Sequence, residues 1–143
     1  MEFVYSTGGR EKYFKAQNVG DCVTRAICNA TGKDYLEVYN GLKELASKER
    51  KTKRHRKKST VRNGTYPRTT EKYIERVLGW KWHSCCRIGS SERTHLTESE
   101  LPSGTLILRL SRHLTCVKDG VLYDTYDCTR EGTRMVYGYW KEE

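Results

Sequence analysis

The chain has 143 residues, a net charge of +9 and six cysteines, which suits one compact domain and is short for two. No stretch approaches the roughly 18 apolar residues of a membrane span, and the N-terminal residues lack the basic start and apolar middle of a signal peptide. We therefore expect a single domain over residues 1–143, a cytoplasmic location, reduced thiols and no membrane partner.

The first half of the chain carries mainly helical signals. The expected elements are a strand followed by three helices, over residues 3–7, 22–30, 35–48 and 70–78. Gly32 stops the first helix, Asp34 caps the second, and Thr70 is expected to cap the third, which ends at Gly79.

From residue 80 the pattern alternates with the period of strands. The expected strands cover residues 80–85, 105–111, 112–118, 121–128 and 133–140. Asp119 and Gly120 stand between two of them and are a strong signal for a two-residue hairpin turn. Helices thus precede strands, and we predict an α+β fold with N-terminal helices packed on a C-terminal antiparallel sheet.

The positive charge is concentrated in one segment. Residues 48–58 hold eight Lys or Arg and one Glu, within a loop expected at about 48–66. Such a run can bind phosphates or acidic proteins, and it can equally be a solvated loop. It contains no aromatic residue to stack on bases. The candidate residues for binding nucleic acid or an acidic partner are Lys51, Lys53, Arg54, Arg56, Lys57 and Lys58.

The cysteines do not predict a metal centre. No Cys-x-x-Cys pair occurs, which argues against structural zinc, and a mixed site of His83 with Cys85 or Cys86 has poor spacing. We expect no metal and no cofactor. Five of the cysteines read as small buried apolar residues, namely Cys28, Cys85, Cys86, Cys116 and Cys128.

Cys22 differs because it stands where a loop becomes a helix. The unpaired backbone N–H groups and the positive dipole end of a helix N-terminus favour a thiolate there. A lowered pKa would make Cys22 nucleophilic at neutral pH.

A nucleophilic thiol needs a base and a group that orients the base. His113 opens the first strand of the predicted hairpin. If Lys118 pairs with Val121 across the turn, Asp124 becomes a diagonal neighbour of His113 on the same face. A one-residue bulge would bring Asp127 to His113 instead, and we prefer Asp124 because the two-residue turn is the common form.

The tetrahedral intermediate also needs hydrogen-bond donors for its oxyanion. The backbone N–H of Cys22 is one, and the side chain of Gln17, five residues upstream, is the other. Asn18 is a weaker choice.

These residues, in this order, resemble the papain-like cysteine peptidases, including compact bacterial peptidases that cut leader peptides. The chain is also similar to small phage and mobile-element proteins that combine a helix start "DCVTRA" with His113, "KDG" and "DTYD". The resemblance covers about residues 17–45 and 100–140. It implies a papain-like fold, Gln17 as part of an oxyanion hole, Cys22 as the nucleophile, and Asp124 as the residue that orients His113.

The leading hypothesis is a peptidase or isopeptidase that acts on a protein or peptide through a Cys22–His113–Asp124 triad and a thioester. The same triad can serve acyl transfer or deamidation. The alternative is a catalytically degenerate papain-like fold that binds nucleic acid or protein through residues 48–58. The sequence leaves the substrate and the oligomeric state open.

Overall fold

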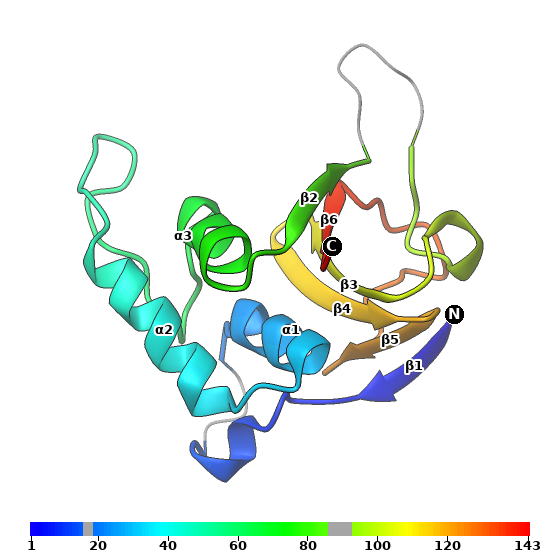
Figure 1. The fold of residues 1–143 in the computed structure, drawn as a ribbon, viewed down its shortest axis with the longest axis horizontal. Coiled ribbons are helices and arrows are strands. Elements are labelled where there is room, and N and C mark those ends of the chain that lie inside the picture. Colours follow the sequence, from blue (N-terminus) through cyan, green and yellow to red (C-terminus); the bar gives the residue numbers. More distant parts are fainter. Residues whose placement is uncertain (16–18, 86–92) are drawn as a thin grey trace.

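The structure is a computed structural model, and it describes residues 1–15, 19–85 and 93–143 (Figure 1). The helices in these ranges are α1 (Cys22–Thr31), α2 (Tyr35–Ser47) and α3 (Pro67–Lys72). The strands are β1 (Glu2–Tyr5), β2 (Lys81–Ser84), β3 (Thr105–Leu110), β4 (His113–Lys118), β5 (Val121–Asp124) and β6 (Gly138–Lys141). Short 3-10 turns cover Arg10–Lys12 and Glu98–Glu100, and a π-helical turn at Tyr73–Val77 continues α3.

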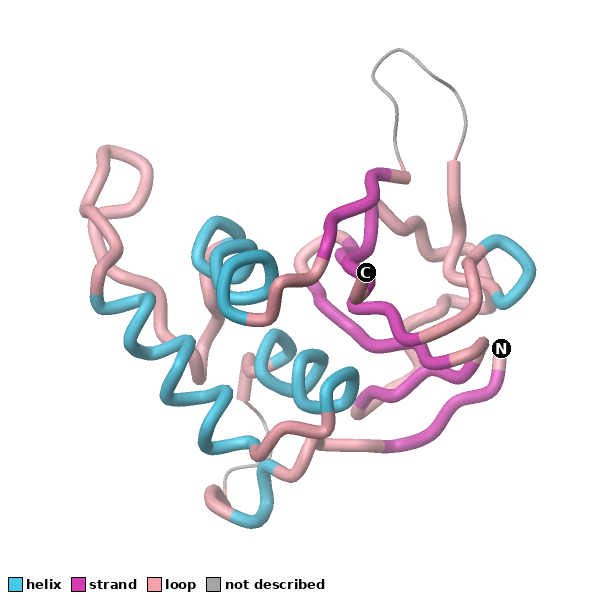
Figure 2. Tube along the Cα trace, viewed as in Figure 1, coloured by secondary structure: helices cyan, strands magenta, loops and turns pink. Residues whose placement is uncertain are grey.

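All six of these strands form one sheet in the order β1-β5-β4-β3-β6-β2 (Figure 2). The α+β class is confirmed, but the sheet is mixed because β1 pairs in parallel with β5 at one edge. The prediction of a purely antiparallel C-terminal sheet is therefore wrong at this strand. The chain leaves β1, forms its helices and returns to the sheet, so that two segments far apart in sequence become neighbours.

Helix α1 lies across the sheet over β4 (Figure 1). Its end is well defined, because Gly32 takes a left-handed φ of 73° and donates its N–H to the carbonyl of Cys28. Ala26 and Ile27 bury their side chains in a core shared with Ile107 and Trp140 of the sheet. Packing this apolar stripe on the sheet fixes the position of the first turn of α1, which begins at Cys22.

The opposite face of the sheet is buried as well. Leu106 and Leu108 alternate with Ile107 along β3 and pack with Leu96 and Val136, which come from the connecting loops. Strand β3 is therefore covered on both faces, which explains its nearly continuous run of branched residues. Burial on both faces makes β3 and its neighbour β4 a rigid support for side chains at their ends.

Several predicted boundaries are wrong, and the three largest differences include the strand predicted over residues 121–128, which ends at Asp124. The third helix begins at Pro67, whose fixed φ suits the first helical position, and Thr70 lies inside the helix and donates its hydroxyl to the carbonyl of Tyr66. The last strand begins at Gly138 rather than at residue 133, because Met135 instead forms an isolated bridge with His95.

Asp34 occupies the N-cap position of α2 as expected, but its side chain makes no capping hydrogen bond. Its carboxylate accepts a hydrogen bond from the hydroxyl of Tyr13 at 2.5 Å instead. Among the described helices, none is long and apolar enough to cross a membrane.

Candidate active site

Cys22 is the first residue of α1, and the residues before it are held tightly. A Cβ on Gly20 would lie 2.9 Å from the backbone oxygen of Asn63, so only glycine permits this approach. Asp21 is buried at the N-cap position and makes no capping bond. Its carboxylate instead accepts hydrogen bonds from three side chains, those of Arg10, Arg25 and Tyr35. The two residues directly before Cys22 are thus fixed, Gly20 by its close approach to Asn63 and Asp21 by its three side-chain partners.

His113 is the first residue of β4, the strand on which α1 packs. Its imidazole and the thiol of Cys22 line the same cavity, and both the imidazole and the backbone N–H of Leu114 lie close enough to that thiol to lower its pKa. Nε2 of the ring lies 2.7 Å from Oδ2 of Asp124. Because a carboxylate accepts only, Nε2 carries a hydrogen.

The hairpin register brings Asp124 to His113. Asp119 and Gly120 have φ values of 47° and 79°, as a type I′ turn requires, and Lys118 pairs with Val121. The register prediction is confirmed, and Asp124 rather than Asp127 contacts the imidazole. Asp127 is exposed and accepts hydrogen bonds from Thr129.

Asp124 is buried, and both of its carboxylate oxygens are occupied. Besides His113, the hydroxyl of Thr115 donates to Oδ2 at 2.7 Å and the backbone N–H of Thr125 donates to Oδ1 at 2.7 Å. Arg25 lies 3.5 Å from Oδ1 and joins this carboxylate to Asp21. Burial raises the pKa of Asp124, but these hydrogen bonds and the charge of His113 lower it overall, so the group is ionised.

The protonation states of His113 and Cys22 support each other. Burial lowers the pKa of His113, but its hydrogen bonds to Asp124, Cys128 and Cys22 prevail and raise the pKa to about 12. Burial likewise raises the pKa of Cys22, and the hydrogen bond and charge of His113 outweigh it, so the pKa of the thiol is lowered. Burial raises the pKa of Cys28 and of Cys116 to about 12. The lowered pKa of its thiol therefore sets Cys22 apart from Cys28 and Cys116.

Cys22 and His113 both line a cavity of about 440 Å³. Its walls come from the start of α1, from the segment that precedes and begins α3, and from the turn between β3 and β4. The remaining lining residues are Val23, Gly64, Thr65, Pro67, Thr70, Arg109, Leu110, Ser111, Arg112, Leu114 and Tyr137. A volume of this size admits a peptide segment or a small molecule.

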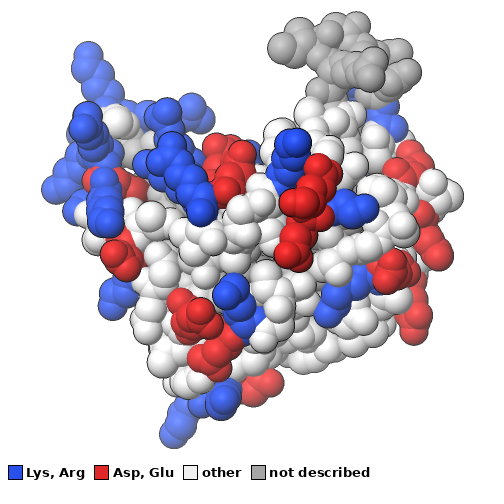
Figure 3. Space-filling model, in the orientation of Figure 1, with Lys and Arg blue, Asp and Glu red and all other residues white. Residues whose placement is uncertain are grey.

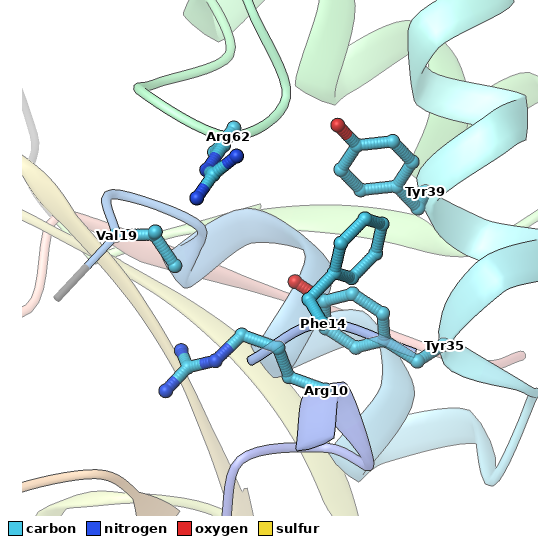
Figure 4. Close-up of a pocket in the computed structure, with 6 residues that line it drawn as sticks. All are labelled: Arg10, Phe14, Val19, Tyr35, Tyr39 and Arg62. Carbon is cyan, nitrogen blue, oxygen red and sulfur yellow. The ribbon is translucent and has the colours of Figure 1, made fainter. Parts of the chain in front are cut away.

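A second hollow, shown in Figure 4, is lined in part by Arg10 and Tyr35, two of the residues that bond to Asp21. Neither Cys22 nor His113 lines it. It is lined by Arg10, Phe14, Val19, Tyr35, Tyr39 and Arg62. Its volume of about 10 Å³ corresponds to one water molecule. The larger cavity is therefore the candidate substrate site.

Three residues that lie close together, one of them His113, could offer ligands to a metal. Nitrogen, oxygen and sulfur atoms of His113, Asp124 and Cys128 lie within 4.8 Å of one another, and within the described ranges this is the one such group. Nε2 and Oδ2 are hydrogen-bonded directly to each other, so a metal between them would have to displace that bond. In the structure these two atoms are thus paired with each other rather than open to an ion.

The basic segment forms a separate feature of the surface. Figure 3 shows Lys and Arg side chains gathered over the loop that follows α2. Lys51, Lys53, Arg54, Arg56, Lys57 and Lys58 are exposed there. The loop is held in place, because Glu49 accepts two hydrogen bonds from Ser59 and the ring of His55 stacks on Tyr66 at 4.1 Å. The basic residues lie on this loop, and none of them lines the cavity.

Sequence reasoning missed two partners of Asp124. Arg25 is assigned no role in the sequence analysis, although the spacing Asp21-x-x-x-Arg25, one turn of a helix, is a signal for an ion pair. Thr115 lies opposite Asp124 in the predicted register and was not assigned a role. Gln17, Asn18 and Cys86 lie outside the described residues.

The ion pair predicts a pH-dependent contribution to stability. The melting temperature of an Asp124→Asn variant is expected to lie below that of the native chain, and this difference should be largest between about pH 4 and pH 6.5. Because the pKa of His113 is raised, this residue makes its full contribution to folding stability below the ordinary histidine pKa of about 6.5. That contribution is lost as pH rises through about 12. Because the pKa of Asp124 is lowered, this residue makes its full contribution to folding stability above about pH 4. That contribution is lost as pH falls through the pKa that Asp124 has in the folded chain.

Thermal unfolding by circular dichroism, measured from pH 3 to pH 10, gives this difference. Asp127→Asn is the matched control, because it makes the same chemical change on an exposed aspartate three residues away. A pH-independent difference for Asp124→Asn, or an equal difference for both variants, would contradict the ion pair.

No protein-family model matches the chain, and searches of curated proteins and of solved structures give no significant match.

Proposed function

We propose that the chain is a papain-like cysteine peptidase or isopeptidase. The observation that carries the proposal is a thiol at the start of α1 that lines the same 440 Å³ cavity as His113, whose Nε2 lies 2.7 Å from Oδ2 of Asp124. This is the arrangement that activates a cysteine, orients its base and leaves room for a substrate.

The chemistry follows from the protonation states. The thiolate of Cys22 forms a C–S bond to the carbonyl carbon of an amide, and the C–N bond breaks as protonated His113 gives its proton to the leaving nitrogen. Neutral His113 then takes a proton from water, whose oxygen forms the C–O bond while the C–S bond of the thioester breaks. Carboxylic acid is released, and thiolate and imidazolium are restored. Asp124 stabilises the imidazolium before the first step and again after the second.

The backbone N–H of Cys22, at the N-terminus of α1, is our first candidate donor for the oxyanion. Gln17 is the second, on the strength of the resemblance and its place five residues upstream. An amine that replaces water would give acyl transfer, and a side-chain amide as substrate would give deamidation; the mass of the product distinguishes these reactions.

Selective alkylation tests the proposal. At pH 6, a limiting amount of iodoacetamide is expected to label Cys22 at least about tenfold faster than any of the other five cysteines, since the thiolate is the reactive form. Peptide mapping by mass spectrometry gives the six rates. A Cys22→Ser variant should lose the fast site and keep the slow ones. Equal labelling of all six cysteines would overturn the proposal.

Failure of that test would favour the alternative, a degenerate fold that binds through residues 48–58. The exposure of the six basic side chains supports it as an additional role, because such a loop can bring acidic or nucleic-acid-bound targets to the molecule.

A further inference from the structure

We propose that the cavity beside Cys22 selects substrates that carry a carboxylate close to the attacked carbonyl group, and that Arg112 recognises this carboxylate. The proposal rests on the function proposed above and names its substrate class. Three observations carry it: the position of Arg112, the charges in the cavity wall, and the occupied state of the neighbouring arginine.

The position follows from the turn between β3 and β4. Leu110 pairs with His113, so Ser111 and Arg112 are the only two residues of the turn. Arg112 is exposed and directly precedes His113, and both residues line the same cavity as Cys22. A group bound by its guanidinium would therefore lie near the reacting sulfur.

The cavity lining offers cationic side chains and no acidic one. It contains Arg109, Arg112 and the protonated His113, and it contains no Asp or Glu. The thiolate of Cys22 would repel an incoming carboxylate, and a cation at the rim offsets this repulsion. The basic loop after α2 adds further positive potential on the face shown in Figure 3.

Arg109 is already engaged. Its guanidinium forms an ion pair with Glu71 at 3.0 Å and lies over the rings of Trp82 and Trp140. Arg112 has neither a hydrogen bond nor an ion pair to any part of the chain that the structure describes. Of the two arginines in the wall, Arg112 is the one available to a ligand, and a guanidinium suits a carboxylate because it can donate two parallel hydrogen bonds.

Alkylation by a charged and a neutral reagent of similar size tests the proposal. The ratio of the Cys22 rate constants for iodoacetate and iodoacetamide is measured at low ionic strength. In Arg112→Glu this ratio is expected to fall at least about fivefold, because reversing the charge near the sulfur repels only the anionic reagent. Salt should shrink the difference between the variant and the native chain.

Arg130→Glu is the matched control. Arg130 is also exposed and has a φ of 50°, against 54° for Arg112, but it does not line the cavity. Its ratio should stay within about twofold of the native ratio, since a screened charge outside the cavity acts weakly on Cys22. An unchanged ratio in Arg112→Glu, or equal falls in both variants, would overturn the assignment.

Two larger probes identify the source of the carboxylate. Chloroacetyl-glycine presents it as a chain terminus does, and acetyl-aspartyl chloromethyl ketone presents it as a side chain. At least one of the two probes should alkylate Cys22 about fivefold more slowly in Arg112→Glu than in the native chain. The probe that is slowed shows whether the carboxylate comes from a chain terminus or from a side chain. The two proposals fail separately: slow labelling of Cys22 by iodoacetamide contradicts the catalytic thiol, whereas fast labelling without charge discrimination contradicts only the role of Arg112.

Discussion

In a His113→Ala variant, iodoacetamide is expected to alkylate Cys22 at least about tenfold more slowly at pH 6 than in the native chain. His113 supplies the two largest contributions that lower the pKa of the Cys22 thiol, a hydrogen bond and a positive charge. Without them, burial, which raises that pKa, is opposed only by the backbone N–H of Leu114 and by Arg25. Each unit of increase in the pKa removes about nine tenths of the thiolate at a pH well below it.

The pH profile gives the sign of this effect. With a lowered pKa, the native thiolate persists below the ordinary thiol pKa of about 8.5 and is lost as pH falls through the native value. The profile of the His113→Ala variant should therefore be displaced to higher pH and approach the native rate only on the alkaline side. Stopped-time alkylation from pH 5 to pH 10, followed by peptide mapping, measures both curves.

His83→Ala is the control for the loss of an imidazole. His83 lies on β2 and bonds to Glu143 at 2.5 Å, and it does not line the cavity. Its profile should coincide with that of the native chain. If the two histidine variants gave the same profile, His113 would have no part in activating the thiol.

The start of α1 and the hairpin could be predicted because each depends on local chemistry. The apolar spacing after Cys22 and the Gly32 stop define a helix within a dozen residues. The Asp119-Gly120 turn has both residues at positive φ, which sets the pairing of Lys118 with Val121 and so selects Asp124. The length of this one turn therefore decides whether Asp124 or Asp127 faces His113.

The surroundings of Asp124 were harder to predict because they join distant segments. Strand β1 pairs in parallel with β5, and the backbone N–H of Ser6 donates to the carbonyl of Asp124 at 2.8 Å. A parallel pairing between the first strand and a hairpin has no local signature in the sequence. The same holds for Arg25, which is 99 residues from Asp124 along the chain.

The boundary errors have local causes. At the third helix, the capping signal of Thr70 competed with Pro67, and the helix begins where proline loses no hydrogen bond. At the last strand, Met135 pairs with His95 outside the sheet. Neither error moves a residue of the candidate site.

An Arg25→Met variant is expected to lose about 3 kcal/mol of unfolding free energy, the lower end of the cost of leaving a buried charge without its partner. The Arg25 side chain is 8% exposed, and its guanidinium bridges Asp21 and Asp124, which are 1% and 3% exposed. Methionine keeps the length and most of the apolar contact of the stem but removes the charge. Urea unfolding followed by tryptophan fluorescence measures the difference.

Arg109→Met is the control for the loss of an arginine that forms an ion pair. Its side chain is 24% exposed and its partner Glu71 is 40% exposed, so the same change should cost about 1 kcal/mol or less. A loss for Arg25→Met no larger than that for Arg109→Met would show that the bridge between the two aspartates contributes little.

A double-mutant cycle shows whether the guanidinium acts as a bridge or only as bulk. Asp21→Asn alone leaves Arg10 and Arg25 with one fewer buried anion, whereas combining it with Arg25→Met removes one charge of each sign. The double variant should therefore be more stable than the sum of the single losses by at least about 1 kcal/mol. Additive losses would mean that the charges do not interact, and Arg25 would then not couple the loop before Cys22 to the carboxylate that holds His113.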